Sequence, residues 1–369
     1  MKLPAILLLT GVLTAKAGVT MSLTASVKNS ARGAKLIFSG TLTNTDASAD
    51  VCLNDIAFDL TGGAQAHLVP GTNLFYSSVP GILLPGETYT GELFETALSA
   101  AAPSGDYAGT VTLKGGAGQL SSDTLATGSF AVLSPDVSVS VTDAMASEFG
   151  PNPGVFTFSR TGRTDISLSV PVTFAGSAVN GTAYQTLSSP VVIPVGAASQ
   201  NVTLTPIPDN IAQGDRAATL TLGVSPFHNN GAVSGASLTI QDKPADAWRL
   251  AHFGPDANTP AAADAADWNG DGISNQLAYA LGLDPVAFDL SKLPAATVSG
   301  GHYQLSWAPN PAAIDMTLTP EASTDLTTWT GGAMEPVQGG APGTMTYRYQ
   351  TSIGQTPRVF LRLRATRIP

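Results

Sequence analysis

Apolar and polar residues alternate over short segments along most of this chain. The clearest example is Val-Ser-Val-Ser-Val at residues 137–141, which gives an extended segment one apolar and one polar face. Similar segments, separated by Gly, Pro, Asn and Asp residues, occupy residues 23–27, 35–43, 51–60, 91–94, 107–113, 303–307, 316–320, 344–349 and 359–363. This pattern predicts a mainly β protein that is built from antiparallel sandwiches.

Only residues 244–290 depart from this alternation. Residues 244–253 and the Ala-rich residues 261–266 favour helices, and residues 276–281 form a further helical run that Gly282 ends. We therefore expect a short helical linker between one β region that ends at residue 243 and another that begins at residue 291.

The middle third carries a series of motifs in a characteristic order. They are Val137-Ser-Val-Ser-Val141, Asn180-Gly-Thr-Ala-Tyr184, Val192-Ile-Pro-Val-Gly196, Leu204-Thr-Pro-Ile-Pro-Asp-Asn210 and Ser237-Leu-Thr-Ile-Gln-Asp242. The series resembles the Calx-beta module, a calcium-linked seven-stranded β-sandwich. The resemblance implies such a sandwich over residues 135–243, with a cluster of carboxylates at one end that binds calcium.

Several acidic positions of that module are changed here. Ala183 stands where the family has an Asp before the Tyr, and Asn210, Gln213, Arg216 and Lys243 replace or accompany other acidic positions. The carboxylates that remain are Glu148, Asp209, Asp215 and Asp242. Losing carboxylates and gaining cations removes most of the attraction for a divalent ion. We therefore expect the fold to persist and the calcium site to be weak or empty.

A second candidate metal site lies in the linker. Positions one, three, five, seven and nine of an EF-hand-like loop are Asp267, Asn269, Asp271, Ile273 (through its carbonyl) and Asn275. With Gly282-Leu-Asp-Pro285, the loop resembles thrombospondin type 3 and dockerin-like calcium loops, but position twelve is Ala278 instead of Glu. Two interpretations stay open: a calcium site with a Kd on the order of 10⁻³ M or weaker, or a turn that Asx hydrogen bonds make rigid. Calcium is the candidate cofactor.

The remaining segments resemble other β-domains. Strings such as Leu84-Pro-Gly-Glu-Thr88 are similar to those of immunoglobulin-like domains of bacterial surface proteins, and residues 321–329 followed by Phe360-Leu-Arg-Leu-Arg364 resemble a small sandwich that follows such acidic loops. The predicted organisation is a signal peptide (1–17), an immunoglobulin-like sandwich (18–134), a Calx-beta sandwich (135–243), a helical linker (244–290) and a C-terminal β-domain (291–369). The last domain carries Arg348, Arg358, Arg362, Arg364 and Arg367. They form either a docking patch for an acidic polymer or the charged face of an edge strand.

Export is predicted from the first residues. A lysine, a short apolar run and Ala15-Lys-Ala17 are typical of a signal peptide, so we expect a bacterial protein that is secreted, periplasmic or at the cell surface. No transmembrane segment is expected after cleavage. The formal net charge of −10 argues against a nucleic-acid partner. The single cysteine, Cys52, excludes an intramolecular disulfide.

The sequence contains no nucleophile elbow, paired-His motif or phosphate loop. We therefore expect a non-catalytic modular β-protein for surface display, adhesion or matrix contact, whose partner is an extracellular protein or glycan. One alternative is a calcium-binding scaffold whose interdomain joint the ion stiffens. Another is a non-catalytic part of a polysaccharide-degrading system, in which Trp248, Trp268, Trp307 and Trp329 would stack on sugar rings.

Overall fold

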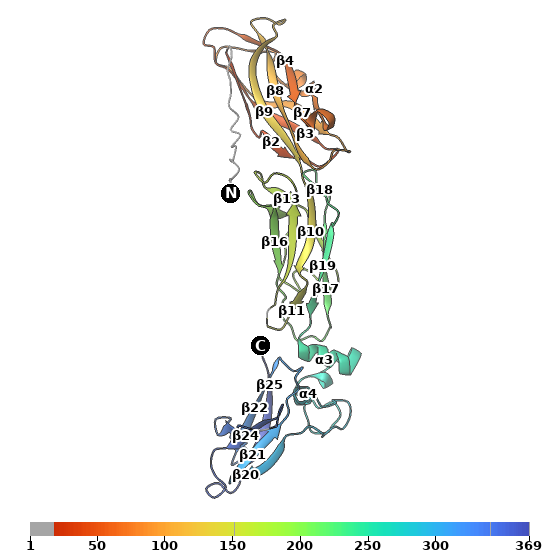
Figure 1. The fold of residues 1–369 in the computed structure, drawn as a ribbon, viewed down its shortest axis with the longest axis vertical. Coiled ribbons are helices and arrows are strands. Elements are labelled where there is room, and N and C mark those ends of the chain that lie inside the picture. The colour runs from red at the N-terminus through yellow and green to blue at the C-terminus, as the bar shows by residue number, and fades with distance from the viewer. Residues whose placement is uncertain (1–17, 151, 340, 369) are drawn as a thin grey trace.

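The computed structural model describes residues 18–150, 152–339 and 341–368. The predicted signal peptide, residues 1–17, lies outside the described residues. Three β units follow one another along the long axis of the molecule, with α3 (Pro244–Phe253) and α4 (Asn275–Leu281) between the second and the third (Figure 1). The prediction of a mainly β chain with sandwich domains is confirmed.

The first domain is a sandwich of two sheets, with strand orders β1–β3–β7–β5 and β2–β9–β8–β4–β6. Its elements are β1 (Val19–Leu23), β2 (Val27–Asn29), β3 (Lys35–Asn44), β4 (Val51–Leu60), α1 (Ala64–His67), β5 (Leu68–Gly71), α2 (Asn73–Ser78), β6 (Ile82–Leu83), β7 (Thr88–Leu98), β8 (Gly105–Gly116) and β9 (Asp123–Ser134). The predicted single strand at residues 23–27 is wrong, because the chain leaves one sheet at Leu23 and joins the other at Val27.

Phenylalanines fill the centre of this first sandwich. The rings of Phe38 and Phe94 stack with centroids 4.8 Å apart, and Phe130 meets both rings edge-on at 5.4 and 5.1 Å. All three side chains are buried. Burial of each such side chain contributes about 2–3 kcal/mol, so this cluster ties the two sheets together.

The second domain has two four-stranded sheets, β16–β12–β10–β18 and β11–β19–β17–β14, and a small β13–β15 pair. Its strands are β10 (Asp136–Asp143), β11 (Met145–Ser147), β12 (Gly154–Arg160), β13 (Leu168–Val170), β14 (Val172–Ala175), β15 (Val191–Ile193), β16 (Ser199–Leu204), β17 (Arg216–Leu222), β18 (Asn229–Asn230) and β19 (Gly235–Gln241). Phe156, Phe158, Tyr184 and Leu220 are buried between the sheets.

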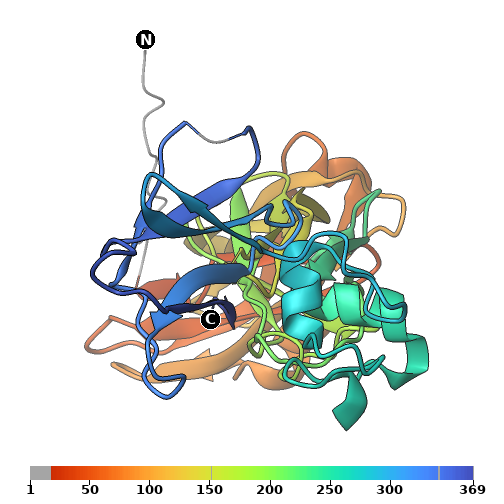
Figure 2. The same ribbon diagram turned by 90° about the horizontal axis from the view of Figure 1, so that it is seen from below.

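The last domain combines a sheet of order β20–β21–β24–β23 with the pair β22–β25. Its strands are β20 (Ala295–Ser299), β21 (His302–Trp307), β22 (Met316–Ser323), β23 (Met334–Pro336), β24 (Met345–Tyr349) and β25 (Phe360–Arg367). Trp307 and Leu363 share a core with Ala278 and Leu281 of α4. Seen from this end of the molecule, α3 and α4 lie to one side of the last domain (Figure 2).

The Ala-rich segment at residues 261–266 does not form the α-helix that its composition favours. It contains only the short 3₁₀ turn η2 (Pro260–Ala262), which follows a similar turn, η1 (Gly254–Asp256). The Asn275 side-chain amide donates to the carbonyls of Ala261 and Ala263, both at 2.9 Å. These carbonyls are therefore bonded to a distant side chain, and the segment is held as a loop against α4.

Candidate functional site

Strand register brings the predicted acidic cluster to the end of the second domain from which α3 starts. β17 and β19 pair Arg216 with Ile240, and β11 runs parallel to the end of β19. Glu148 directly follows β11, and Asp242 directly follows β19. The topology therefore places Glu148 and Asp242 beside Arg216.

Glu148 is paired with a cation of the same chain. Its side chain is 1% exposed, its Oε1 accepts a hydrogen bond from the Arg216 guanidinium at 2.5 Å, and its Oε2 accepts one from the Asp209 N–H at 3.4 Å. Burial and the Asp209 charge raise the pKa of Glu148, and Arg216 holds back part of this rise. Arg216 thus supplies the positive charge that a buried carboxylate needs.

Asp242 is bonded to backbone amides. Its Oδ2 accepts from the N–H groups of Gln213 and Gly214 at 3.0 and 2.9 Å, and its Oδ1 accepts from the N–H of Lys243 at 2.9 Å. Burial raises the pKa of Asp242, and these N–H donors counteract that rise. Asp215 accepts a hydrogen bond from the N–H of Asp242 at 3.3 Å, so it also stabilises the backbone at this end of the domain.

The donors at this end of the second domain do not fit a calcium ion well. Calcium takes six or more oxygens, whereas Glu148 faces a guanidinium, Asp242 faces three amides, and Asp209 accepts from the Gln213 side chain at 2.9 Å. Across the described ranges, no group of three or more His, Cys, Asp or Glu side chains gathers to hold a metal. That this site is weak or empty stays a prediction.

In the linker loop, carboxylate side chains accept hydrogen bonds from backbone N–H groups of the same loop. Asp267 Oδ1 accepts from the N–H of Gly270 at 2.9 Å, and its Oδ2 accepts from the N–H of Gly272 at 2.7 Å. Asp271 Oδ1 accepts from the N–H of Ile273 at 2.9 Å, and the Asn269 amide donates to Asp271 Oδ2 at 3.0 Å. These Asx-type bonds are those expected of a turn that is rigid without a metal.

Two later positions of the loop point elsewhere. The Asn275 side chain bonds the carbonyls of residues 261 and 263, and Ala278, at position twelve, is buried in the core of the last domain. The loop thus keeps oxygens at positions one, three, five and seven, which is fewer than calcium takes. Calcium binding here stays a prediction, at millimolar strength or weaker.

A buried network of charges lies between the helical segment and the last strand. Asp246 of α3 is fully buried and pairs with Arg249 at 2.7 Å and with Arg367 of β25 at 2.8 Å. Arg367 also holds Asp264 through two bonds, at 2.6 and 2.8 Å. Burial alone would lower the pKa of Arg367, but Asp264 and Asp246 raise it above its usual value. We call these four residues the charge network.

Further polar contacts fix α3 to both neighbouring domains. Arg249 donates to the carbonyl of Asn210 at 2.6 Å, and the Asn258 side chain both donates to and accepts from the backbone of Ala212 at 2.8 Å. On the other side, Asp315 accepts from the N–H of Ala245 at 2.9 Å and from the Tyr279 hydroxyl at 2.7 Å. Residues 244–290 therefore act as a wedge that contacts both domains.

The joint between the first two domains is also bonded across. Asn229 Oδ1 accepts from the N–H of Arg32 at 2.7 Å, and its amide donates to Ser134 Oγ at 3.0 Å. Arg32 pairs with Asp136 at 2.9 Å. His228, in the same loop, is 2% exposed, and its Nε2 lacks a partner among the described residues. Burial lowers the pKa of His228.

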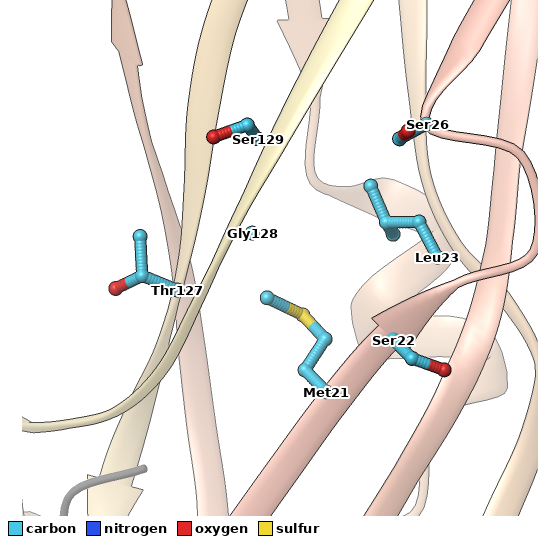
Figure 3. Close-up of a pocket in the computed structure, with 7 residues that line it drawn as sticks. All are labelled: Met21, Ser22, Leu23, Ser26, Thr127, Gly128 and Ser129. Carbon is cyan, nitrogen blue, oxygen red and sulfur yellow. The ribbon is translucent and has the colours of Figure 1, made fainter. Parts of the chain in front are cut away.

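Two adjoining cavities, of about 210 and 230 Å³, lie on the first domain. Residues Met21, Ser22, Leu23, Ser26, Thr127, Gly128 and Ser129 line the first, and Met21 and Leu23 lie between β1 and β9 (Figure 3). Its lining carries hydroxyl and apolar groups and no titratable side chain, and Arg163 is the one charged residue along the second. This lining offers no acid–base pair for catalysis.

The four tryptophans do not stack along a common groove in the described structure. Trp248 packs on Tyr279, with ring centroids 5.2 Å apart, and Trp268 stacks on Phe253 at 4.6 Å. Trp307 is buried and stacks on Tyr347 at 5.5 Å. Trp248, Trp268 and Trp329 are partly exposed, and the Arg362 guanidinium covers one face of the Trp329 ring at 4.2 Å.

Sequence reasoning identified the acidic residues of the second domain but missed the charge network. Asp246 and Arg367 stand 121 positions apart, and no spacing rule joins them. The sequence does not single out Arg367, because it is one of three arginines in β25. Within the described ranges, no helix is long and apolar enough to cross a bilayer.

Comparisons with known proteins give similarity to β-sandwich structures. No protein-family model and no curated protein matches the chain. The Escherichia coli adhesin FdeC is 14% identical over 93% of this chain and 91% of its own, with a TM-score of 0.32. The calcium-binding domain CBD12 of CALX1.1 is 13% identical over 62% of this chain and 74% of its own (TM-score 0.28), and the apo Calx CBD1 domain is 18% identical over 29% and 98% (TM-score 0.25). Identities and scores this low give no basis for transferring a ligand or partner.

Proposed function

We propose that this chain is an exported bacterial surface protein that serves as a stiff, non-catalytic β scaffold for display, adhesion or matrix contact. Its partner in this proposal is an extracellular protein or glycan. The observation that carries the proposal is that polar contacts fix both joints between the β units, partly buried ones at the first joint and a buried ion pair at the second. Asn229 bonds across the first joint, and the charge network lies at the second.

Such joints suit a protein that holds a binding end away from a surface. A flexible linker lets neighbouring domains reorient, whereas a buried hydrogen-bonded contact must be broken before they can move. The lining of the 210 Å³ cavity, which carries no titratable side chain, supports a non-catalytic role. The signal-peptide pattern of residues 1–17 supports export.

Two measurements test this proposal. Small-angle X-ray scattering of residues 18–369 should give one extended particle, and the variant Asn229→Ala combined with Arg367→Met should give a broader distribution of lengths. Surface labelling and pull-downs with intact cells should place the protein outside the cell and show that it binds there. A compact or freely jointed wild-type chain, or a chain that binds no cell, glycan or protein, would contradict the proposal.

The second candidate function is a scaffold whose second joint calcium stiffens. It is favoured by the position of the Asp267 loop between α3 and α4, and by Asn269, which donates to the carbonyl of Ala287 at 2.6 Å. Thermal unfolding in calcium and in chelator separates the two functions. An increase in Tm with about 5 mM calcium, roughly five times a Kd of 10⁻³ M, would favour this candidate.

A further inference from the structure

The last domain is basic on an acidic chain. Residues 291–369 carry six of the 17 Lys and Arg residues but only four of the 27 Asp and Glu residues. Of these six cations, Lys292 donates to the Gly282 carbonyl, Arg348 pairs with Glu335, and Arg367 belongs to the charge network. The other three are Arg358, Arg362 and Arg364, which we call the arginine row.

The arginine row stands on one face of the last strand pair. Side chains two residues apart in a strand point to the same face, so Arg362 and Arg364 share the outer face of β25. Arg358 lies before this strand, four residues from Arg362, and continues the same even-numbered positions. Their side chains are open, at 44% for Arg362 and 58% for Arg364. Opposite Arg364 in β22 stands the smaller Thr319. The row extends over about 20 Å, because each strand residue advances about 3.3 Å.

Aromatic rings and one carboxylate hold this row in place. The Arg362 guanidinium lies 4.2 Å from the Trp329 ring centroid, and Arg358 lies 5.9 Å from that of Phe360. Glu321, whose side chain is 8% exposed, pairs with Arg362 at 2.6 Å and with Arg364 at 3.2 Å. Arg358 forms no ion pair with any residue that the structure describes. The face therefore keeps an excess of positive charge.

A neighbouring carboxylate does not cancel this excess. Asp325 follows β22, and its Oδ1 accepts from the N–H groups of Thr327 and Thr328, both at 2.8 Å. These bonds lower the pKa of Asp325, so this carboxylate stays ionised. Three arginines against the two carboxylates Glu321 and Asp325 still leave the face positive. Arg358 is thus available to a ligand, and Arg364, although it pairs with Glu321, keeps a side chain that is 58% exposed.

We propose that the outer face of β22 and β25 binds an acidic polysaccharide whose sugars carry carboxylates. Charge complementarity with the arginine row is the first argument, and the planar fork of arginine matches a carboxylate. The second argument is that the rings of Trp329 and Phe360 lie beside Arg362 and Arg358, and aromatic rings beside such cations can pack on the apolar faces of sugar rings. A repeating polymer engages several weak contacts at once along the row. The inference rests on the proposed function, because it names the ligand class of the surface scaffold.

The test uses residues 18–369 and polygalacturonate as the probe, with calorimetry and tryptophan fluorescence in about 50 mM NaCl, where screening of exposed charges is limited. The variant Arg358→Gln combined with Arg364→Gln leaves the Glu321–Arg362 pair in place. We expect its affinity to fall about tenfold, since it loses two exposed ion pairs. The matched control, Arg348→Gln, removes an exposed arginine that pairs with Glu335 away from this face, and its affinity should stay within about twofold of wild type.

Three results would overturn the inference: a wild-type chain that does not bind polygalacturonate, a control variant that loses as much affinity as the double variant, or equally tight binding of single-stranded DNA or of phosphatidylglycerol vesicles.

Cell binding separates this inference from the proposed function. If the double variant still binds cells as the wild type does, the polysaccharide face is wrong and the scaffold function stands. If the wild type binds polygalacturonate but is found inside the cell, the surface function is wrong.

Discussion

Replacing Arg367 by methionine tests whether buried charges hold the second joint. The substitution keeps most of the aliphatic volume but removes three hydrogen bonds, one to Asp246 and two to Asp264. Asp246 is fully buried and keeps a single partner, Arg249, at 2.7 Å. Asp264 loses both of these bonds, although its side chain is 34% exposed and water can reach it.

The expected loss of stability follows from these two exposures. Removing one partner of a buried ion pair costs about 3–5 kcal/mol when the other is left without compensation. Here Arg249 compensates Asp246 in part, and water compensates Asp264 in part. We therefore expect Arg367→Met to lower the free energy of unfolding of the unit that contains α4 and the last domain by about 2–3 kcal/mol.

Calorimetry and urea unfolding of residues 18–369, with one transition fitted per unfolding unit, measure this loss. The matched control is Arg348→Met, because Arg348 and Glu335 are both exposed and their pair is worth about 0.5 kcal/mol. Adding Asp264→Asn to Arg367→Met should recover part of the loss, since no unpaired carboxylate then remains at residue 264. Equal losses for Arg367→Met and Arg348→Met would refute the reasoning.

Three further predictions concern the other sites. Burial lowers the pKa of His228 below its ordinary 6.5, so the unfolded chain binds the proton more readily than the folded chain. The contribution of His228 to stability should be constant above pH 6.5 and should fall below it by up to about 1.4 kcal/mol per pH unit. A pH series of His228→Gln should lack this fall. Arg216→Ala leaves the buried Glu148 unpaired and should cost about 3 kcal/mol. About 5 mM calcium should raise the Tm of the second-domain transition in this variant but leave that transition of the wild type within about 1 °C. A calcium-dependent second-domain transition in the wild type would count against the assignment. Asn229→Ala removes three hydrogen bonds at the first joint, to Arg32, Ser134 and Pro135. It should cost about 2 kcal/mol and should speed proteolysis near residue 135, whereas an unchanged cleavage rate would show that the joint does not depend on Asn229.

The fold class followed from local pattern, because a strand buried on one face must alternate in sequence. Where prediction failed, distant contacts decided the outcome. The carbonyls of Ala261 and Ala263 are bonded by Asn275, so a composition that favours a helix yields a loop. Likewise, residues 23–27 read as one strand, yet the two ends of this segment belong to different sheets.

The candidate site, like the fold, could be predicted only in part. A known motif order located Glu148 and Asp242, because the resemblance fixes which loops meet at one end. It did not show what those carboxylates bond, since the amides of Gln213 and Gly214 become donors only when their loop folds back on β19. The charge network could not be predicted, because Asp246 lies at the start of the helical segment and Arg367 at the end of the last domain, 121 positions later.

The carboxylates at the end of the second domain have a structural reason to persist without a metal. A buried carboxylate is tolerated only when donors surround it, and Glu148 and Asp242 obtain theirs from Arg216 and from backbone amides of residues 213, 214 and 243. Replacing either carboxylate alone would leave the guanidinium or the amides without an acceptor at the end where α3 begins. The geometry of this end is therefore set by groups of the chain itself, and it should hold over a range of calcium and salt concentrations, because buried pairs are screened little.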